Sequence, residues 1–318
     1  MAAKAPYAST LAADAARVTE LAAIASYAQI GLGDEKAADQ LAVDAMRTAL
    51  NQLDIDGKIV IGEGERDEAP MLYIGEKVGT GKGPAIDIAL DPLEGTTLTA
   101  KAMANALCVL AMSPGGGMLH APDTYMDKIA IGPGHAPGLV DLDMSPADNV
   151  RALAGAKGVK PDEITVCVMD RPRHAELIAA LREVGARIVL ITDGDIAGVI
   201  HTAEPETGID LYLGSGGAPE GVLAAAALKC VGGQFQGRLI FRNDDERARA
   251  ERTGVTDFDR KYDLHELVSR DAVFAATGVT KGAMLDGVKI MGGFVTTHTL
   301  VMDSATRTVR RIHMTRPI

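Results

Sequence analysis

The sequence contains no tryptophan, and aromatic residues make up only 3% of its 318 residues. So few aromatic side chains argue against a surface that stacks the bases of single-stranded nucleic acid. The charge balance agrees, because 43 acidic residues exceed 32 basic ones and the formal net charge is −11. Such a chain has no general electrostatic attraction to nucleic acid or to an anionic membrane. If it handles phosphate, we expect a metal ion between its carboxylates and the ligand.

Only three cysteines are present, Cys108, Cys167 and Cys230, and no two of them form a CxxC pair. An odd number of widely spaced thiols with apolar neighbours predicts buried, reduced cysteines and a cytoplasmic protein. No long apolar run occurs, since the longest uncharged stretch, 102–122, is broken by Ser113-Pro114-Gly115. We therefore expect no membrane span and no targeting signal.

The length predicts two domains of about 150 residues each. The first half has an α+β pattern, with helices over 9–30 and 36–53 and strands over 58–61, 86–90, 103–112 and 125–131. The second half alternates strands at 164–169, 187–191, 209–213 and 237–241 with helices at 174–184, 196–201 and 219–230. This alternation favours a mostly parallel sheet. We expect an exposed loop or helix over 242–260 and two strands over 295–314.

The predicted fold class is therefore α/β, in a two-domain layered arrangement. A break at 154–158 places the boundary between domains 1–155 and 156–318.

An acidic run follows the strand at 58–61. Its carboxylates are Glu63, Glu65, Asp67 and Glu68, and glycines stand at positions 62 and 64. Carboxylates that converge at a strand end suit Mg²⁺ or Mn²⁺. Taken alone, the run is better interpreted as a solvated acidic turn.

A second group of acids lies on the strand at 86–90 and just after it. Alternation places Asp87 and Asp91 on one face, and Glu94 follows. Gly95-Thr96-Thr97 can open a helix with a threonine cap, whose free N–H groups bind phosphate. Three acids are too many for a simple Asp-Pro turn, so we favour a functional site.

A glycine-rich segment covers 214–221, with Pro219 suited to the first helical position and Glu220 to the first turn. Its glycines can expose N–H groups to a phosphate, and Glu220 can reach a metal ion. The segment matches neither the dinucleotide fingerprint nor a P-loop. A turn followed by a helix is an equally favoured interpretation.

Two further strand-to-helix turns are Asp170-Arg171-Pro172-Arg173-His174 and Asp193-Gly194-Asp195. Arginines there suit an anionic group and aspartates suit sugar hydroxyls, although each turn alone fits ordinary helix capping. The sequence has no HExxH or GxSxG motif. Metal-assisted hydrolysis with carboxylate ligands is therefore favoured over a serine or cysteine nucleophile.

Four segments carry a resemblance to a known family. They are Asp-Gly-Lys-Ile-Val-Ile-Gly-Glu-Gly-Glu at 56–65, Ala-Pro-Met-Leu-Tyr-Ile-Gly-Glu at 69–76, Asp-Pro-Leu-Glu-Gly-Thr at 91–96 and Gly-Gly-Ala-Pro-Glu-Gly at 216–221. With them the chain resembles the bacterial class II fructose-1,6-bisphosphatases, which belong to the lithium-sensitive, Mg²⁺-dependent phosphomonoesterases. The resemblance covers nearly the whole chain.

The resemblance implies a set of site residues. The implied ligands of two Mg²⁺ or Mn²⁺ ions are Asp39, Glu63, Asp91, Glu94 and Glu220. The implied substrate contacts are Glu94, Gly95, Thr96, Tyr125, Arg171, Pro172, Arg173, Asp193, Gly194, Asp195 and Gly217. The implied catalytic group is Thr96, which orients the attacking water with the nearby acids Asp67 and Glu65.

The implied reaction is hydrolysis of the 1-phosphate of fructose 1,6-bisphosphate to fructose 6-phosphate, a gluconeogenic step, in a homodimer or homotetramer. The alternatives are activity on sedoheptulose 1,7-bisphosphate, inositol monophosphatase-like activity and a non-catalytic sugar-phosphate sensor. One departure stands at Gly31-Leu32-Gly33-Asp34-Glu35-Lys36, where the family commonly reads Gly-Arg-Gly-Asp-Lys. Lys36 is the basic residue that can substitute there.

Overall fold

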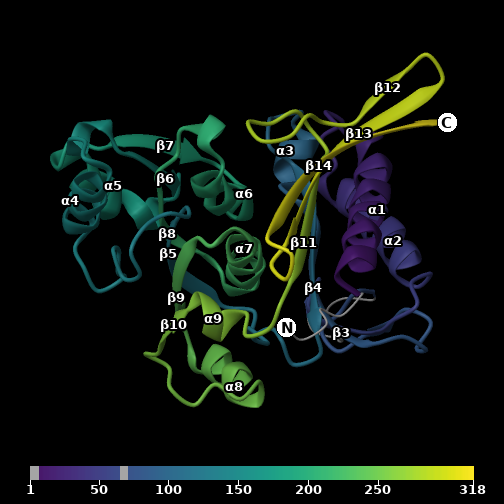
Figure 1. Cartoon of the computed structure of the whole chain (residues 1–318), viewed down its shortest axis with the longest axis horizontal. Helices are drawn as coiled ribbons and strands as arrows, with labels where there is room; N and C mark the ends of the chain where they lie inside the picture. Colours follow the sequence, from purple (N-terminus) through teal and green to yellow (C-terminus); the bar gives the residue numbers. More distant parts are fainter. Residues whose placement is uncertain (1–6, 65–70) are drawn as a thin grey trace. The chain divides into compact units, whose positions relative to one another are not determined.

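The fold consists of two compact units (Figure 1). The structure is a computed structural model that describes residues 7–64 and 71–318, with the side chains of 7–10 left out. The first unit comprises Met1–Leu119 and Val268–Ile318, and the second comprises His120–Leu267. This division differs from the predicted one at residue 155.

Long-range strand pairing explains the difference. Strand β11 (Val273–Gly278) pairs antiparallel with β4 (Leu107–Pro114), so the end of the chain completes the sheet that its beginning starts. Strand β5 (Tyr125–Ile131) pairs instead with β8 (Leu211–Gly217) and β9 (Gln234–Ile240). Local periodicity predicts the strands, but it carries no information on which strands pair.

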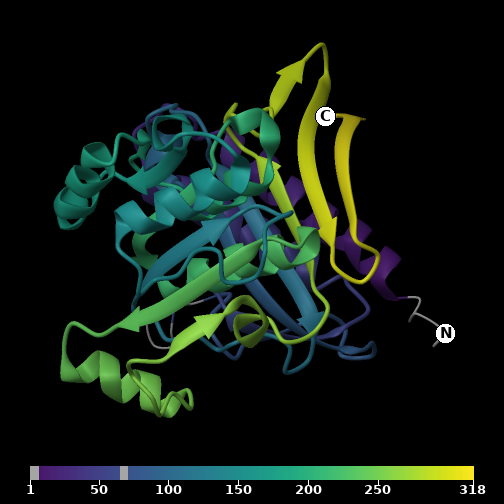
Figure 2. The same cartoon turned by 60° about the vertical axis from the view of Figure 1, so that its left-hand side comes forward.

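The described residues of the first unit form an eight-stranded sheet in the order β12-β13-β11-β4-β3-β1-β2, with β14 on the outer side of β13. Its other strands are β1 (Asp56–Ile61), β2 (Lys77–Val78), β3 (Ala85–Glu94), β12 (Lys289–Met291), β13 (Phe294–Asp303) and β14 (Thr308–Pro317). Figure 2 shows β13 and β14 side by side as a long hairpin, which is the pair of strands predicted over 295–314.

Two helices cover one face of this sheet: α1 (Tyr7–Tyr27) and α2 (Glu35–Leu50). Both agree with the predicted helices. Small residues such as Ala15 and Ala22 let α1 lie close to the strands, and Met46 of α2 joins the same core. Asp34 caps α2, because its carboxylate accepts a hydrogen bond from the backbone N–H of Ala37 at 3.0 Å. The short helix α3 (Thr96–Ala100) follows β3.

The second unit has a six-stranded sheet in the order β10-β9-β5-β8-β6-β7. Its other strands are β6 (Thr165–Met169), β7 (Arg187–Ile191) and β10 (Lys261–Asp263). Its helices are α4 (Pro146–Lys157), α5 (Ala175–Glu183), α6 (Asp195–Ile200), α7 (Ala218–Val231), α8 (Asp244–Arg252) and α9 (Leu264–Leu267), with short 3-10 turns at Pro161–Glu163, Pro172–His174, His201–Ala203 and Pro205–Thr207.

The predicted parallel sheet is correct for the strands that alternate with helices but wrong for the sheet as a whole. Strands β6, β7, β8 and β9 run in one direction, whereas β5 lies antiparallel between β8 and β9, and β10 is antiparallel at the edge. The insertion of β5 is possible because α7 carries the chain from β8 over β5 to β9.

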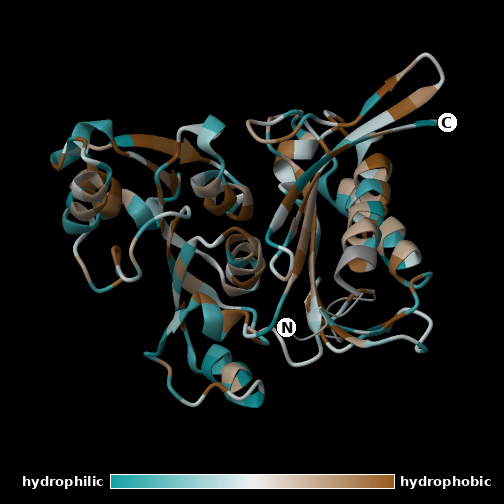
Figure 3. Ribbon diagram, viewed as in Figure 1, coloured by the Kyte–Doolittle hydropathy of each residue, from teal (hydrophilic) through white to brown (hydrophobic). Residues whose placement is uncertain are grey.

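Figure 3 shows the hydropathy of these elements. Strand β7, with four consecutive aliphatic residues, is brown along most of its length, although it is an edge strand whose residues are largely exposed. Helix α8 is largely teal and confirms the predicted charged segment over 242–260. Among the described helices, none is long and apolar enough to cross a membrane.

Candidate active site

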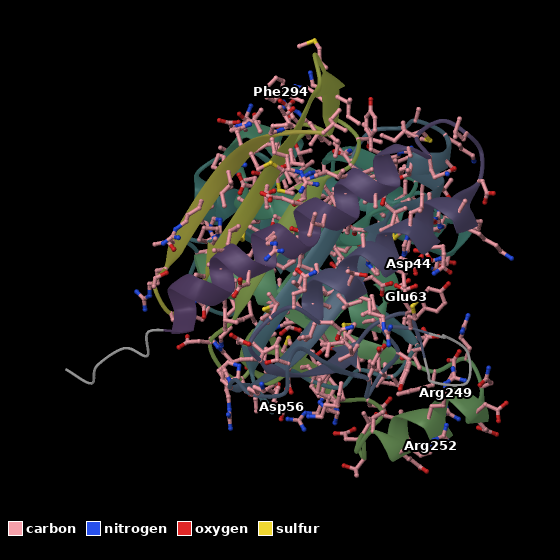
Figure 4. All side chains as sticks on the ribbon, turned by 90° about the vertical axis from the view of Figure 1, so that its right-hand side faces the viewer. Asp44, Asp56, Glu63, Arg249, Arg252 and Phe294 are labelled. Carbon is pink, nitrogen blue, oxygen red and sulfur yellow. The ribbon has the colours of Figure 1, made fainter. Side chains whose placement is uncertain are left out.

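In the first unit, acidic residues stand at the ends of two parallel strands. Strand β1 pairs parallel with β3, and Ile61 lies opposite Ala89. Glu63 follows two residues after Ile61, and Asp91 follows two residues after Ala89. The carboxyl ends of neighbouring parallel strands form the usual ligand edge of an α/β sheet. Glu63, which is labelled in Figure 4, therefore belongs to the same strand edge as the second group of acids.

A glycine is required next to Glu63. A Cβ atom at Gly62 would lie 2.0 Å from the carbonyl oxygen of Leu72. The backbone N–H of Glu63 donates a hydrogen bond to that same carbonyl at 3.1 Å. The glycine thus lets the segment at residue 72 approach and fixes the backbone that carries the Glu63 carboxylate.

A β-bulge brings Asp91 and Glu94 onto one face. Asp91 lies opposite Val109 and Glu94 opposite Leu107, so three steps along β3 match two steps along β4. Without the extra residue, side chains three positions apart would point to opposite faces. Pro92 lies in this bulge, which is one of the few places where a sheet tolerates proline. Leu90 and Leu93 point into the core under α1 and α2, so the two acids lie on the opposite face.

Asp39 approaches the same edge from α2. Burial raises the pKa of the Cys108 thiol well above its usual value, and the nearby carboxylates of Asp91 and Asp39 raise it further. Both carboxylates therefore lie in the neighbourhood of Cys108. Burial also raises the pKa of half-buried Asp39, and no described residue forms a hydrogen bond or ion pair with its carboxylate.

Thr96 opens α3 but does not cap it. The capping position is Gly95 in the left-handed conformation, with φ of 88°, and no side chain caps this end. The predicted threonine cap is therefore wrong, because glycine supplies the turn that a cap residue would otherwise make. The Thr96 hydroxyl, two residues after Glu94, therefore makes no capping hydrogen bond.

Asp87 is not part of this group. Its carboxylate accepts hydrogen bonds from the backbone N–H groups of Gly116 and Gly117, at 2.7 and 3.0 Å. These bonds compensate for its burial and fix the turn after β4. Of the three acids singled out around this strand, Asp87 has a structural role.

Three of the predicted acids, Glu65, Asp67 and Glu68, lie outside the described residues. Within the residues that the structure does describe, no three histidine, cysteine, aspartate or glutamate side chains stand close enough to hold a metal ion together. The first unit thus brings its acids to one edge without closing them into a ligand cage.

In the second unit, the glycine-rich segment is a strand rather than a loop. Gly214, Gly216 and Gly217 belong to β8 and pair with β5. A Cβ atom at Gly216 would lie 2.0 Å from Asp195 Oδ2, and one at Gly217 would lie 1.9 Å from Glu220 Oε2. That the N–H groups of these glycines also bind phosphate stays a prediction. The glycines are needed because acidic side chains pack directly onto the strand.

Glu220 lies in the first turn of α7, after Pro219, as the sequence predicts. Burial raises its pKa, and the neighbouring Asp195 raises it further, whereas Lys128 lowers it. Its Oε2 atom is buried and finds no hydrogen-bond partner among the described residues. A buried carboxylate oxygen without a donor, like the uncompensated Asp39, fits an oxygen-seeking divalent cation.

A buried ion pair lies next to Glu220. Lys128 Nζ, on β5, is 2.5 Å from Asp195 Oδ2, at the start of α6. The two side chains are 1% and 7% exposed. One of the two carboxylate oxygens of Asp195 is therefore already bound to Lys128. The adjacent Asp193 accepts a hydrogen bond from the backbone N–H of Gly194 at 3.1 Å, and Gly194 takes the left-handed conformation that begins α6.

Arg173 is fixed by Ser215. Its Nε donates to Ser215 Oγ at 3.0 Å and its Nη2 donates to the Ser215 carbonyl at 2.7 Å. His174 Nε2 accepts from the Ser215 backbone N–H at 2.8 Å, so its Nδ1 carries the proton and donates to the Met169 carbonyl at 2.7 Å. Burial lowers the pKa of His174, in keeping with a neutral ring.

Tyr125 completes this group at the start of β5. The Arg173 guanidinium carbon lies 4.8 Å from the centre of the Tyr125 ring, and the Arg242 guanidinium carbon lies at the same distance. Gly217 is opposite Tyr125 in the strand pairing. Arg171 lies outside the group, since its one described side-chain hydrogen bond goes to the neighbouring Asp170 carbonyl at 3.3 Å, and Pro172 is exposed.

A family model described as bacterial fructose-1,6-bisphosphatase, glpX-encoded, matches residues 9–316. The chain belongs to this family. It is 47% identical over 316 residues to the class 2 fructose-1,6-bisphosphatase 1 of Escherichia coli (strain K12), which covers 95% of this chain and 94% of that protein. It is also 47% identical over 325 residues to a protein from Synechococcus sp. (strain JA-3-3Ab) named D-fructose 1,6-bisphosphatase class 2/sedoheptulose 1,7-bisphosphatase, with 93% of each chain covered.

Among solved structures, an inositol monophosphatase from Anabaena (Nostoc) sp. PCC 7120 matches 62% of this chain and 72% of its own, at 13% identity and a TM-score of 0.32.

Sequence reasoning missed three residues of this fructose-bisphosphatase family member: Lys128, Ser215 and Arg242. Lys128 carries a recognisable signal, because it stands between Met126 and Ala130 on what would otherwise be an apolar face of a strand. Arg242 carries none, since its position beside Tyr125 depends on the pairing of β5 with β9.

Proposed function

We propose that this chain hydrolyses the 1-phosphate of fructose 1,6-bisphosphate, giving fructose 6-phosphate and inorganic phosphate. The observation that carries the proposal is the shared strand edge in the first unit, where Glu63 follows β1, Asp91 and Glu94 end β3 on one face, and Thr96 follows. Membership of the fructose-1,6-bisphosphatase family gives the substrate class. The reaction is a gluconeogenic step.

Mg²⁺ or Mn²⁺ is the proposed cofactor. The residues proposed to hold two such ions are Asp39, Glu63, Asp91, Glu94 and Glu220. Support comes from the absence of a described partner for the Asp39 carboxylate and for Glu220 Oε2. When bound, such cations neutralise phosphoryl oxygens and the leaving alkoxide and increase the acidity of water.

Thr96 is the proposed catalytic group of the first unit. Its hydroxyl accepts or passes a proton and so orients the attacking water, and Asp67 and Glu65 are the acids proposed to assist it. Because Gly95 makes the turn at the start of α3, the hydroxyl has no capping bond that competes with this task. Glu94 and Gly95 are the adjacent proposed substrate contacts.

In the second unit, Tyr125, Arg173 and Gly217 are proposed to contact the phosphate that is not cleaved, with Arg171 and Pro172 beside them. The guanidinium of Arg173 is oriented by Ser215 before any ligand arrives, which lowers the entropy lost on binding. Asp193, Gly194 and Asp195 are the proposed contacts of the sugar hydroxyls. Asp195 would use Oδ1, because Lys128 holds Oδ2.

A second substrate, sedoheptulose 1,7-bisphosphate, is proposed as an alternative or additional activity. It is favoured by the name of the Synechococcus relative, which includes sedoheptulose 1,7-bisphosphatase. An inositol monophosphatase-like activity and a non-catalytic sugar-phosphate sensor are the remaining alternatives. We also propose a cytoplasmic homo-oligomer, a dimer or tetramer.

A phosphate-release assay tests these proposals. The purified protein is given each bisphosphate and inositol 1-phosphate, with Mn²⁺ or Mg²⁺ and after exhaustive chelation. We expect release of one phosphate from fructose 1,6-bisphosphate, loss of this activity with EDTA and recovery when metal is added. Full activity after chelation would contradict the metal proposal, and release from the inositol substrate alone would contradict the sugar bisphosphatase.

A further inference from the structure

Arg242 is a charged residue of the second unit that the proposed function leaves unused. It follows β9 and stacks on the Tyr125 ring, with its guanidinium carbon 4.8 Å from the ring centre. The strand register accounts for this position, because Tyr125 is opposite Ile240, two residues before Arg242. Attraction between a guanidinium and an aromatic face holds such a pair together.

Glu246 fixes the orientation of Arg242. Its Oε1 accepts from Arg242 Nε at 2.7 Å and from Nη2 at 2.5 Å, while its Oε2 accepts from the Arg242 backbone N–H at 2.7 Å. The Glu246 side chain is 1% exposed, whereas that of Arg242 is 57% exposed. A buried carboxylate thus anchors a guanidinium whose remaining edge faces solvent.

Arg173 is held in the same manner on the same ring. Nε and Nη2 are the nitrogens in use in both arginines, with Ser215 as the acceptor for one and Glu246 for the other. For neither arginine does any described residue accept a hydrogen bond from Nη1. Because both guanidinium carbons lie 4.8 Å from the centre of the Tyr125 ring, the two groups are close neighbours, and each keeps a nitrogen that can donate to an anion. Guanidinium groups of this kind suit a phosphate.

Helix α8 is tied to this place independently. Arg249 Nη2 donates to the carbonyl oxygen of Asp123 at 3.1 Å, two residues before Tyr125. Asn243 caps the helix by accepting from the Glu246 backbone N–H at 2.9 Å. The carboxylates near the cluster are those of Glu246 and Asp123, and Asp123 raises the pKa of Arg242 together with Glu246, which is the larger cause.

We propose that Arg242 is a specificity-determining residue, which together with Arg173 binds the phosphate group that stays on the sugar and so selects bisphosphates over monophosphates. The proposal rests on the proposed function for the assignment of Tyr125 and Arg173. The contact exists equally in the ground state and the transition state, so it acts on KM rather than on kcat.

The test is Arg242→Gln, assayed on fructose 1,6-bisphosphate and on fructose 1-phosphate, which carries only the phosphate that is cleaved. We expect KM for the bisphosphate to rise roughly ten- to a hundredfold, the size of a charge-assisted contact. We expect kcat to change little and KM for fructose 1-phosphate to stay the same. An unchanged KM for the bisphosphate, or an equal rise for both substrates, would overturn the proposal.

Arg247→Gln is the matched control. Arg247 lies on the same helix, is 53% exposed and also pairs with an acid, Asp244, at 3.2 Å, but it does not contact Tyr125. The substitution removes the same charge and is expected to leave both KM values unchanged. If Arg247→Gln raises KM as much as Arg242→Gln does, the effect is one of overall charge and the specific role of Arg242 is refuted.

Calorimetric binding of fructose 6-phosphate separates this inference from the proposed function. We expect Arg242→Gln, and not Arg247→Gln, to weaken this binding about tenfold or more. If the wild-type protein binds fructose 6-phosphate through Arg242 but hydrolyses no bisphosphate, the proposed function fails and the inference stands. If the wild-type protein hydrolyses fructose 1,6-bisphosphate and Arg242→Gln binds fructose 6-phosphate normally, the inference alone fails.

Discussion

The two units place charge at their functional edges in opposite ways. In the first unit, the carboxylates of Asp39, Glu63, Asp91 and Glu94 approach one edge, and Asp39 has no partner among the described residues. In the second unit, Lys128, Arg173 and Arg242 are each held by a defined acceptor. The second edge is thus organised before a ligand binds, whereas the first fits the proposal that a cation from outside completes it.

The largest effect is expected from Thr96→Ala. Orientation of the attacking water contributes on the order of 10²–10⁴ in rate, so kcat should fall by about that factor while substrate binding is kept. Thr96→Ser retains the hydroxyl and should keep a substantial share of the rate. Since no side chain caps α3, neither variant should melt earlier. A Thr96→Ala enzyme with normal kcat would remove the hydroxyl from the mechanism.

Lys128→Met tests whether the buried ion pair with Asp195 stabilises the second unit. The change leaves Asp195 buried without its cation and close to Glu220, and loss of one member of a buried pair costs about 3–5 kcal/mol. Urea denaturation should show this loss in the free energy of unfolding. Lys128→Met combined with Asp195→Asn should recover most of it. A loss below about 1 kcal/mol would show that the pair does not organise this unit.

Arg173→Ala and Arg171→Ala compare an oriented arginine with one that lacks such support. For Arg173 we expect KM to rise roughly ten- to a hundredfold with little change in kcat. For Arg171, whose described side-chain bond goes only to a neighbouring carbonyl, we expect a smaller rise. Steady-state kinetics distinguishes the two. A large fall in kcat at constant KM would place that arginine at the phosphate that is cleaved.

Asp39→Asn should have the smallest effect on stability, and in the opposite direction. Removing a half-buried carboxylate without a partner should stabilise the metal-free protein by about 1 kcal/mol. The same change should reduce the rise in melting temperature that Mn²⁺ produces in the wild type. Thermal melts with EDTA and with Mn²⁺ measure both. Destabilisation of the metal-free protein would mean that Asp39 has a structural partner.

The sequence predicts the elements better than it predicts their pairing. The strands predicted over 125–131 and 187–191 agree with β5 and β7 in both bounds, because both segments are rich in β-branched and other large apolar residues. The course of β11 back to β4 and the position of β5 between β8 and β9 depend on contacts far apart in the chain.

The same distinction applies to the candidate site. Alternation alone would separate Asp91 from Glu94, and only the bulge at Pro92 explains their common face. The glycines at 214–217 were predicted to bind phosphate, but a glycine required by a neighbouring side chain looks the same in sequence as one required by a ligand. Arg242 was not predicted because a charged residue before a polar helix has no local feature that marks it.

The most direct test titrates Mn²⁺ into the chelated protein and follows two properties in parallel, hydrolysis of fructose 1,6-bisphosphate and calorimetric binding of fructose 6-phosphate. The account predicts that hydrolysis starts near zero and rises to saturation with Mn²⁺, while fructose 6-phosphate binds with the same affinity throughout. Full hydrolysis before any Mn²⁺ is added, or binding of fructose 6-phosphate that itself requires the metal, would contradict it.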